Sequence, residues 1–419
     1  MSLTQAFGSQ DQILSKAFSI LENSIAARAF PAASIAVTHE RRLVALKAFG
    51  HVTYAQNAEG ALPLSRSSRQ GVDLDVAPTT LFDLASLTKV LATTPMAMLL
   101  YESGVLDLDT PVAAIVPEFM PGARTAKDPR RQEVTLRMLL AHSSGLPAYE
   151  KLFLQARNRD ELLHKAFTTP LAADPATRAE YSDIGFIILG AALERLAGEP
   201  LDLFCRREIF GPLGMIHTTF NPPPESRGNI PPTANEEESQ WDTHVSDETL
   251  GASCAREAQQ AQPPAGVVQK IRSTFRKRII QGEVQDENAF VLGGVAGHAG
   301  LFSTAEDVAR FAHSMLEGGR PILRPETVAL FTRRESAPPG TSRALGWDTP
   351  TPPSQSGEYF GANSFGHLGY TGTSLWINPD RQLSITLLTN RTWPDCSNQA
   401  IKDVRPKFHD AVVEALTSA

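Results

Sequence analysis

Apolar side chains recur at helical spacing near both ends of the chain and cluster in short runs just inside them. Residues 11–29 and 398–417 each place apolar positions on one stripe, which predicts two amphipathic terminal helices. The apolar runs 34–38 and 43–49 are separated by a short polar turn, which predicts a β-hairpin. Two further apolar runs near the C-terminus, separated by an Asn-Pro-Asp-Arg turn, predict a second pair of strands.

The central part of the chain has a different pattern, because its apolar positions follow helical spacing over long stretches. We predict a helix over 86–101, bent at Pro95, and a mostly helical region over 105–220. Residues 305–317 predict another helix, with acidic residues in its first turn. The segment 221–287 is rich in proline and poor in apolar residues, so we interpret it as an insertion or long flap.

This order of elements predicts an α+β fold. An antiparallel sheet built from both ends of the chain is flanked by the terminal helices, and an inserted helical region lies to one side. Residues 1–105 together with 288–419 are expected to form one discontinuous α/β domain. Residues 106–287 are expected to form a mostly helical domain that includes the insertion at 221–287. A binding site is expected in the cleft between the sheet and the helical region.

The composition is that of a folded globular protein, since 42% of the 419 residues are hydrophobic and 20% are charged. The formal net charge of −7 argues against nucleic-acid binding, which needs a basic face. No apolar run approaches the roughly 18 residues of a membrane span. The three cysteines fit no metal-ligand spacing, and we expect neither a metal nor a cofactor. The sequence leaves the oligomeric state open.

The N-terminus shows no charged segment followed by an apolar one. The chain as read therefore predicts a cytoplasmic protein. It fits equally well a mature periplasmic or secreted form whose leader has been removed.

Ser86 and Lys89 form a Ser-x-x-Lys motif at the start of the predicted helix 86–101. Residues three apart share a helix face, with Cβ atoms about 5–6 Å apart, so the amine lies within reach of the hydroxyl. A nucleophilic serine needs a base, and a lysine is one way to supply it. A serine at the start of a helix also offers its own N–H to an oxyanion.

Two later segments carry further candidate chemistry. Tyr181 and Asp183 stand just before a long apolar run, where a phenol at the start of a buried helix can point into a cleft. The glycine-rich stretch 366–373, which contains His367 and Gly369, leads into a predicted strand. Such a strand edge lets the backbone approach a ligand closely and offers N–H groups to it.

With these three segments in this order, the chain resembles the serine penicillin-recognising superfamily, which includes β-lactamases, D,D-peptidases, D-aminopeptidases and related esterases. The segments are similar to the Ser-x-x-Lys, Tyr-x-Asn and Lys-Thr-Gly motifs of its class C branch. The resemblance covers nearly the whole chain outside 221–287. The run 293–304 also resembles bacterial serine hydrolases that occur alone or fused to cell-wall glycosidases, which suggests peptidoglycan fragments as substrates.

The resemblance implies the β-lactamase/D,D-peptidase, or transpeptidase-like, fold and an acyl-enzyme mechanism without metal. Ser86 would attack a carbonyl, Lys89 and Tyr181 would transfer the proton, and the N–H groups of Ser86 and Tyr370 would form the oxyanion hole. The identity of the general base stays open at this point, because two such groups at hydrogen-bonding distance titrate as a pair.

The chain departs from the family pattern at two places. Asp183 stands where the family has asparagine, and its carboxylate favours the ammonium form of Lys89, which shifts the balance toward Tyr181 as base. His367 begins a His-Leu-Gly sequence in place of Lys-Thr-Gly, so the lysine that helps hold a substrate carboxylate is missing. Arg391, after the last strand, is a candidate to replace that cation. We expect weak hydrolysis of penicillins and stronger hydrolysis of small esters or of amides that lack the carboxylate.

The sequence therefore predicts a serine hydrolase that acts on small esters, amides or D-amino acid peptides, in the manner of an esterase or a D-aminopeptidase. A D,D-carboxypeptidase and a β-lactamase are the alternatives within the same superfamily. The alternative from another class is a catalytically silent descendant that binds peptidoglycan fragments or a protein partner.

Overall fold

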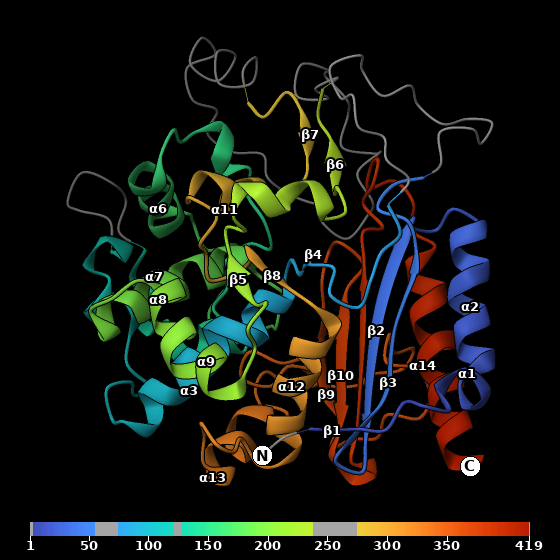
Figure 1. Cartoon of the computed structure of the whole chain (residues 1–419). Helices are drawn as coiled ribbons and strands as arrows, with labels where there is room; N and C mark the ends of the chain where they lie inside the picture. The colour runs from blue at the N-terminus through green and yellow to red at the C-terminus, as the bar shows by residue number, and fades with distance from the viewer. Residues whose placement is uncertain (1–2, 55–73, 121–127, 238–274, 419) are drawn as a thin grey trace.

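The computed structural model describes residues 3–54, 74–120, 128–237 and 275–418. Its principal sheet has the strand order β1-β3-β2-β11-β10-β9, which brings the two ends of the chain side by side (Figure 1). The antiparallel hairpin of β2 and β3 joins the antiparallel hairpin of β10 and β11 through the β11–β2 pair. The six strands are β1 (Thr4–Gln5), β2 (Ala32–His39), β3 (Arg42–Gly50), β9 (Phe365–Leu368), β10 (Ser374–Asn378) and β11 (Leu383–Thr389).

Helices cover both faces of this sheet. The terminal helices α2 (Ser15–Ala26) and α14 (Ile401–Ser418) pack against each other on one face, and α12 (Ala305–Leu316) packs on the other. Alternate strand residues point to opposite faces. Ile35 and its neighbours on the same face therefore pack under the terminal helices, while Ala36 and its neighbours join a second, larger core.

The second core lies between the sheet and the helical part of the chain, which contains two smaller sheets. The α+β prediction, with a sheet flanked by terminal helices and an inserted helical region, is confirmed; only the two-residue β1 pairs in parallel. The remaining helices are α1 (Gln10–Ile13), α3 (Thr94–Glu102), α4 (Val112–Ile115), α5 (Leu136–Leu140), α6 (Arg159–Thr168), α7 (Asp183–Ala197), α8 (Leu201–Cys205), α9 (Gly211–Leu213), α11 (Glu287–Val291) and α13 (Pro325–Thr332). The short strands are β4 (Phe82–Asp83), β5 (Thr219–Phe220), β6 (Ala234–Asn235), β7 (Ile279–Ile280) and β8 (Leu301–Ser303).

The predicted helix over 86–101 is present as a continuous helical run from Leu87 to Glu102, with Ser86 in the turn just before it. Within this run, Lys89–Thr93 form a wider π-helical turn that leads into α3. Pro95 has no N–H to donate and occupies the first turn of α3, where none is needed. The N–H of Thr94 donates to the Lys89 carbonyl, five residues back, so the chain widens before the proline instead of bending at it.

The two ends of the insertion 221–287 lie against the body of the protein, and 238–274 falls outside the described residues. The short strand β6 pairs with β7, and the Asn235 N–H donates to the carbonyl of Pro394, which follows the last strand. Arg276 is buried and forms an ion pair with Glu236. Within the described ranges, no helix has the length and apolar character needed to cross a bilayer.

Candidate active site

Ser86 lies in a tight turn between β4 and the π-helical turn, and the turn has an unusual backbone conformation. Ala85 has a φ of 47°, in the left-handed region that non-glycine residues rarely adopt. The Asp83 carboxylate holds this conformation, since it accepts hydrogen bonds from the Ala85 N–H at 2.8 Å and the Gln285 N–H at 2.6 Å. Such backbone strain persists only where the surroundings fix it, and it is concentrated at functional sites.

Two side chains meet at the Ser86 hydroxyl. The phenol of Tyr181 donates a hydrogen bond to Ser86 Oγ at 2.6 Å, and Lys89 Nζ lies 2.9 Å from the same oxygen. The three groups that the sequence analysis selected from separate parts of the chain are thus in direct contact. This arrangement provides a nucleophile with two groups that can exchange its proton.

Lys89 is fully buried and has two further partners. Its Nζ donates to Asp183 Oδ1 at 2.7 Å and to the carbonyl of His298 at 2.9 Å. Burial lowers the pKa of the Lys89 amine below its ordinary 10.5, although the charge of Asp183 raises it. The Asp183 carboxylate therefore orients the amine, while the loss of solvent favours its neutral form.

Tyr181 is held by the start of α7. Ser182 caps the helix by accepting from the Gly185 N–H at 3.0 Å, and its own N–H donates to His142 Nδ1 at 3.0 Å. The His142 ring packs against the Tyr181 ring, with 4.8 Å between centroids. Burial raises the pKa of Tyr181 well above 10, and the negative charge of Asp183 adds to this effect, so the phenol stays protonated at neutral pH.

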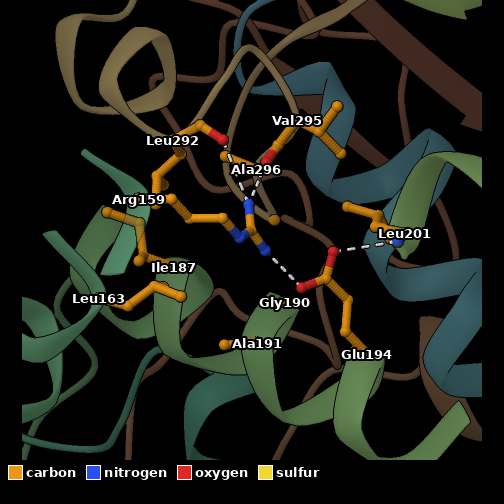
Figure 2. A pocket seen from close by; sticks show the side chains of 11 residues that line it. Arg159, Leu163, Ile187, Gly190, Ala191, Glu194, Leu201, Leu292, Val295 and Ala296 are labelled. Atoms are coloured by element: carbon orange, nitrogen blue, oxygen red, sulfur yellow. Dashed lines mark hydrogen bonds and ion pairs between the residues drawn. The ribbon is translucent and has the colours of Figure 1, made fainter. Parts of the chain in front are cut away.

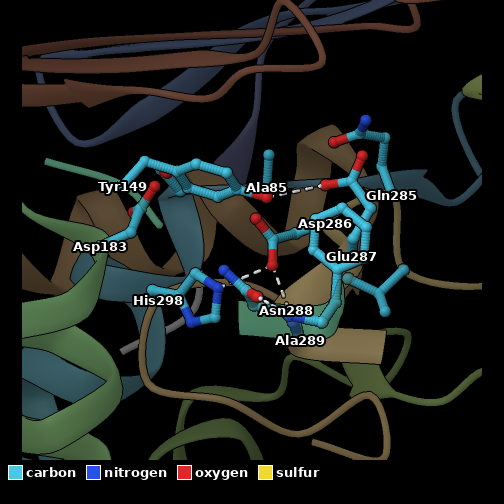
Figure 3. Close-up of polar contacts among 12 residues, drawn as sticks. Ala85, Tyr149, Asp183, Gln285, Asp286, Glu287, Asn288, Ala289 and His298 are labelled. Atoms are coloured by element: carbon cyan, nitrogen blue, oxygen red, sulfur yellow. Dashed lines mark hydrogen bonds and ion pairs between the residues drawn. The ribbon is translucent and has the colours of Figure 1, made fainter. Parts of the chain in front are cut away.

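The carbonyl of His298 is fixed in turn by the side chain of that residue. His298 Nε2 lies 2.8 Å from Asp286 Oδ1, which also accepts from the Ala289 N–H at the start of α11 (Figure 3). His298 thus contributes its backbone to the lysine and its ring to the support of the site.

A second N–H donor is available beside Ser86. Neither the Ser86 amide nor the Tyr370 amide donates to a protein acceptor among the residues with described positions. The loop that carries Tyr370 is attached to the strand before the nucleophile, because Thr371 Oγ1 donates to the Asp83 carbonyl at 2.8 Å and Thr373 Oγ1 to the Leu84 carbonyl at 3.1 Å. These contacts tie the loop that carries the Tyr370 N–H to the residues just before Ser86, and the oxyanion hole stays a prediction.

Gly369 allows this close approach. A Cβ atom at Gly369 would lie 1.9 Å from Thr373 Oγ1 and 2.5 Å from the Leu84 carbonyl oxygen. A side chain at this position would therefore push the Tyr370 loop away from the nucleophile.

His367 also lies close to the Tyr181 ring, with 5.9 Å between centroids. Burial lowers the pKa of its imidazole to about 3, and the positive charges of Lys89 and Arg343 contribute to the shift. The Nδ1 atom lies 2.7 Å from the Leu368 carbonyl, which accepts its hydrogen. His367 is therefore neutral at pH 7 and supplies no positive charge for a substrate carboxylate.

Arg391, the candidate to replace that charge, holds the backbone behind the Tyr370 loop. Its guanidinium donates to the carbonyls of Tyr370 at 2.7 Å, Cys396 at 3.1 Å and Asn398 at 3.3 Å, and it lies 4.5 Å from the Tyr370 ring centroid. Nε and Nη1 of Arg391 thus hold the loop behind Tyr370, and the expectation that Arg391 replaces the missing lysine stays a prediction. It is a supporting residue.

The sequence analysis missed another arginine. Arg343 lies in the loop before β9, outside every motif, and its guanidinium carbon is 5.5 Å from the centroid of the Tyr181 ring. An arginine in the long loop between α13 and β9 gives no local signal of function, and only the fold brings Arg343 to Tyr181. Among the described residues, no group of three or more histidine, cysteine, aspartate or glutamate side chains is arranged to hold a metal ion.

A pocket beside α7 is separate from these residues (Figure 2). It holds only about 10 Å³, room for about one water, because the Arg159 side chain occupies it. Arg159 donates to the carbonyls of Leu292 and Val295 at 3.2 and 3.1 Å and forms an ion pair with Glu194. The arginine thus ties the segment that leads to His298 to helices α6 and α7.

Comparisons with known proteins identify the family of this chain and proteins that share its fold. A family model described as Beta-lactamase matches residues 18–404. The N-acetylmuramyl-L-alanine amidase of Bacillus subtilis (strain 168) is 32% identical over 395 residues, which cover 90% of this chain and 81% of that protein. The structure of EstCE1, a hydrolase with promiscuous acyltransferase activity, matches with a TM-score of 0.68 at 21% identity and covers 96% of this chain and 99% of that one.

A penicillin-binding protein homologue from Pyrococcus abyssi, which is octameric, matches with a TM-score of 0.61 at 20% identity, over 93% of this chain and 76% of that one. At these identities the two solved structures show a common fold. Fold and relatives together define the protein as a serine hydrolase, as the sequence predicts. The chain belongs to the β-lactamase family.

Proposed function

We propose that this protein hydrolyses amide bonds in peptidoglycan-derived fragments through an acyl-enzyme on Ser86. The main support for the proposal is that two proton-transferring groups contact the Ser86 hydroxyl. Tyr181 OH lies 2.6 Å and Lys89 Nζ 2.9 Å from Ser86 Oγ. The amide as scissile bond is supported by the relative named N-acetylmuramyl-L-alanine amidase, at 32% identity. Small activated esters are expected to react through the same acyl-enzyme.

In this proposal Lys89 is the general base. A neutral amine has two N–H donors and one lone pair. Asp183 and the His298 carbonyl accept the two N–H groups, which leaves the lone pair facing Ser86 Oγ. The Tyr181 phenol donates to the same oxygen, so the proton of Ser86 points toward the amine. The opposite pKa shifts of Lys89 and Tyr181 favour this assignment over a phenolate base.

The reaction then proceeds in two stages, acylation and deacylation. Ser86 Oγ forms a bond to the substrate carbonyl carbon while its proton passes to Lys89, and the carbonyl oxygen becomes an oxyanion that the N–H groups of Ser86 and Tyr370 bind. The C–N bond breaks, and the leaving amine takes up a proton through Tyr181, which regains one from Lys89. Water then attacks the ester carbon and gives its proton to Lys89. The C–O bond to Ser86 breaks, Ser86 Oγ takes that proton back from Lys89, and the acid leaves.

A substrate panel tests the proposal. The wild-type protein and Ser86→Ala are incubated with N-acetylmuramyl-L-alanine, an N-acylated D-alanyl-D-alanine, benzylpenicillin and p-nitrophenyl acetate, and products are measured by chromatography. We expect amide and ester hydrolysis that Ser86→Ala loses, with penicillin the slowest substrate. Turnover of penicillin alone would favour the β-lactamase alternative, and release of D-alanine alone the D,D-carboxypeptidase alternative. Turnover that survives in Ser86→Ala would contradict the proposal.

A further inference from the structure

Arg276, which lies just before β7 in the insertion 221–287, combines a buried charge with a strained backbone. Its side chain has no solvent exposure, and its φ of 37° lies in the left-handed region that non-glycine residues rarely adopt. Both features destabilise the folded state unless the surroundings compensate for them. Because such strain is concentrated at functional sites, Arg276 is a candidate for a role in catalysis.

The guanidinium of Arg276 is bound on two sides. Nε and Nη2 donate to the two carboxylate oxygens of Glu236 at 3.1 and 2.6 Å, which makes a bidentate ion pair. Nη1 donates to the Val284 carbonyl at 2.9 Å, and Nη2 donates also to the Gln285 carbonyl at 2.8 Å. Glu236 directly follows β6, and its N–H donates to the Arg278 carbonyl at 3.0 Å. The arginine therefore ties these two carbonyls to the strand pair of β6 and β7.

The segment that Arg276 holds supports the nucleophile. The Gln285 N–H donates to one carboxylate oxygen of Asp83 at 2.6 Å, and the other oxygen accepts from the Ala85 N–H at 2.8 Å. Ala85 is the strained residue directly before Ser86. A displacement of Gln285 would therefore be passed on to the turn that carries the nucleophile.

The same segment supports the base. Asp286 follows Gln285 directly, and its Oδ1 lies 2.8 Å from His298 Nε2 and accepts from the Ala289 N–H at 2.7 Å (Figure 3). The His298 carbonyl in turn accepts from Lys89 Nζ at 2.9 Å. Two adjacent residues, Gln285 and Asp286, thus reach the nucleophile and the base through separate sets of contacts.

We propose that Arg276 is a positioning residue for catalysis, which fixes Ser86 and Lys89 relative to each other. Its hydrogen-bond partners are Glu236 and two backbone carbonyls, so it acts through Gln285 and Asp286. A displacement of about 1 Å at a catalytic group can lower a rate by about 10²-fold. The inference rests on the proposed acyl-enzyme mechanism at Ser86 and adds to it a role for the described ends of the insertion.

Arg276→Lys tests the proposal, because lysine keeps the positive charge but lacks the planar fork that binds Glu236 and the two carbonyls together. The matched control is Arg131→Lys. Arg131 is also buried, and it donates to the carbonyls of Phe119 and Thr169 at 2.6 and 2.7 Å. Thermal unfolding is measured for the wild type and both variants, and kcat and KM for p-nitrophenyl acetate are measured well below the unfolding temperatures.

We expect both variants to unfold at a lower temperature than the wild type. Arg276→Lys should also lose about 10-fold to 100-fold in kcat, with a change in KM of less than about threefold, whereas Arg131→Lys should keep kcat within about threefold. An equal loss of kcat in the two folded variants would show a general effect of stability and overturn the proposal. An unchanged kcat in Arg276→Lys would overturn it as well.

A double-mutant cycle tests whether Arg276 acts through Asp286. Arg276→Lys and Asp286→Asn are measured singly and together. If the arginine works by holding Asp286 in place, the loss of kcat in the double variant should be smaller than the product of the two single losses. Losses that multiply would overturn the proposed action through Asp286.

Glu236→Gln decides the question if Arg276→Lys does not fold, because glutamine leaves the guanidinium one acceptor oxygen where it now has two. A loss of kcat at constant KM in this variant would support the proposal, and an unchanged kcat would overturn it. The proposed function fails separately, if neither p-nitrophenyl acetate nor a fluorophosphonate acylates Ser86 in the wild type. An acylated wild type whose kcat does not depend on Arg276 would overturn this inference alone.

Discussion

Lys89 Nζ and Asp183 Oδ1 lie 2.7 Å apart in a site where the lysine side chain has no solvent exposure. Two effects act on the amine in opposite directions, because burial favours the neutral form and the carboxylate favours the charged form. Burial is the larger of the two, so the pKa of Lys89 falls below 10.5. The pair therefore gives the enzyme a base whose strength depends on one neighbouring charge.

The first prediction follows from the sign of that charge. Asp183→Asn removes a group that raises the pKa of Lys89, so this pKa falls further and the amine is neutral down to lower pH. The acid limb of the pH profile of kcat/KM on p-nitrophenyl acetate should move to lower pH, whatever happens to the maximal rate. Asp160→Asn, at an exposed position, should leave the limb in place. A shift of the limb to higher pH would exclude Lys89 as the base.

The second prediction concerns the phenol. Tyr181→Phe removes the hydrogen bond to Ser86 Oγ and the path by which the leaving amine takes up its proton, so kcat for amides should fall by about 10²-fold to 10⁴-fold. Because burial keeps the Tyr181 pKa well above 10, the wild type should show no loss of activity from tyrosine ionisation below pH 10. Stopped assays over pH 5–10 on both proteins measure this, with Tyr359→Phe as a surface control. Full amide turnover in Tyr181→Phe would remove the phenol from the mechanism.

The third prediction concerns the loop that carries the Tyr370 N–H. Gly369→Ala places a methyl group where only 1.9 Å separates it from Thr373 Oγ1, so the loop must move away from Ser86. Loss of one oxyanion donor typically lowers kcat by about 10²-fold to 10³-fold. Gly228→Ala is the matched control, because a Cβ there has no atom within 4 Å. Both variants are compared by kcat on p-nitrophenyl acetate and by thermal unfolding. Equal activity of the two variants would show that the loop position does not matter.

The fourth prediction links stability to pH. Burial raises the pKa of Asp83 to about 6, from 3.8. Between these values the folded protein binds more protons than the unfolded chain, so the free energy of unfolding decreases as pH rises from about 4 to about 6. The difference amounts to about 3 kcal/mol for this group.

Asp83→Asn should remove this component, and urea unfolding of both proteins at pH 4 and pH 7 measures it. The variant should also lose activity. The two carboxylate oxygens of Asp83 accept from the Ala85 and Gln285 N–H groups, whereas asparagine has one acceptor oxygen and an NH₂ group that cannot accept the second hydrogen bond. An identical pH dependence of stability in the two proteins would contradict the buried, bridging role of Asp83.

The sequence indicated the fold and the nucleophile because both leave local patterns. Alternating and helical spacing predicted the two hairpins and the terminal helices, and three short motifs predicted Ser86, Lys89 and Tyr181. The residues that hold the catalytic groups in place left no such pattern in the sequence. Asp286 orients His298, and Asp83 fixes the strained Ala85 while it accepts a hydrogen bond from the distant Gln285 N–H, yet neither carboxylate belongs to a motif.

Arg391 and Arg343 also show that local sequence patterns do not predict which residues the loops bring to the site. Arg391 follows a strand end near the motif and suggested a substrate contact, but the carbonyls around it use its donors. Arg343 has no motif, and its position at Tyr181 depends on how the loop before β9 folds back along Gly366. Sequence spacing predicts which residue types are present near a site, whereas the packing of the loops decides which cation lies beside Tyr181.

The most direct test of the account is intact-mass spectrometry of the wild type and Ser86→Ala after brief incubation with a fluorophosphonate and, separately, with a p-nitrophenyl ester quenched in acid. The account predicts one covalent adduct per wild-type chain, located on the peptide that contains Ser86, and none on Ser86→Ala. An adduct that persists in Ser86→Ala, or a wild-type chain that both reagents leave unmodified, would contradict it.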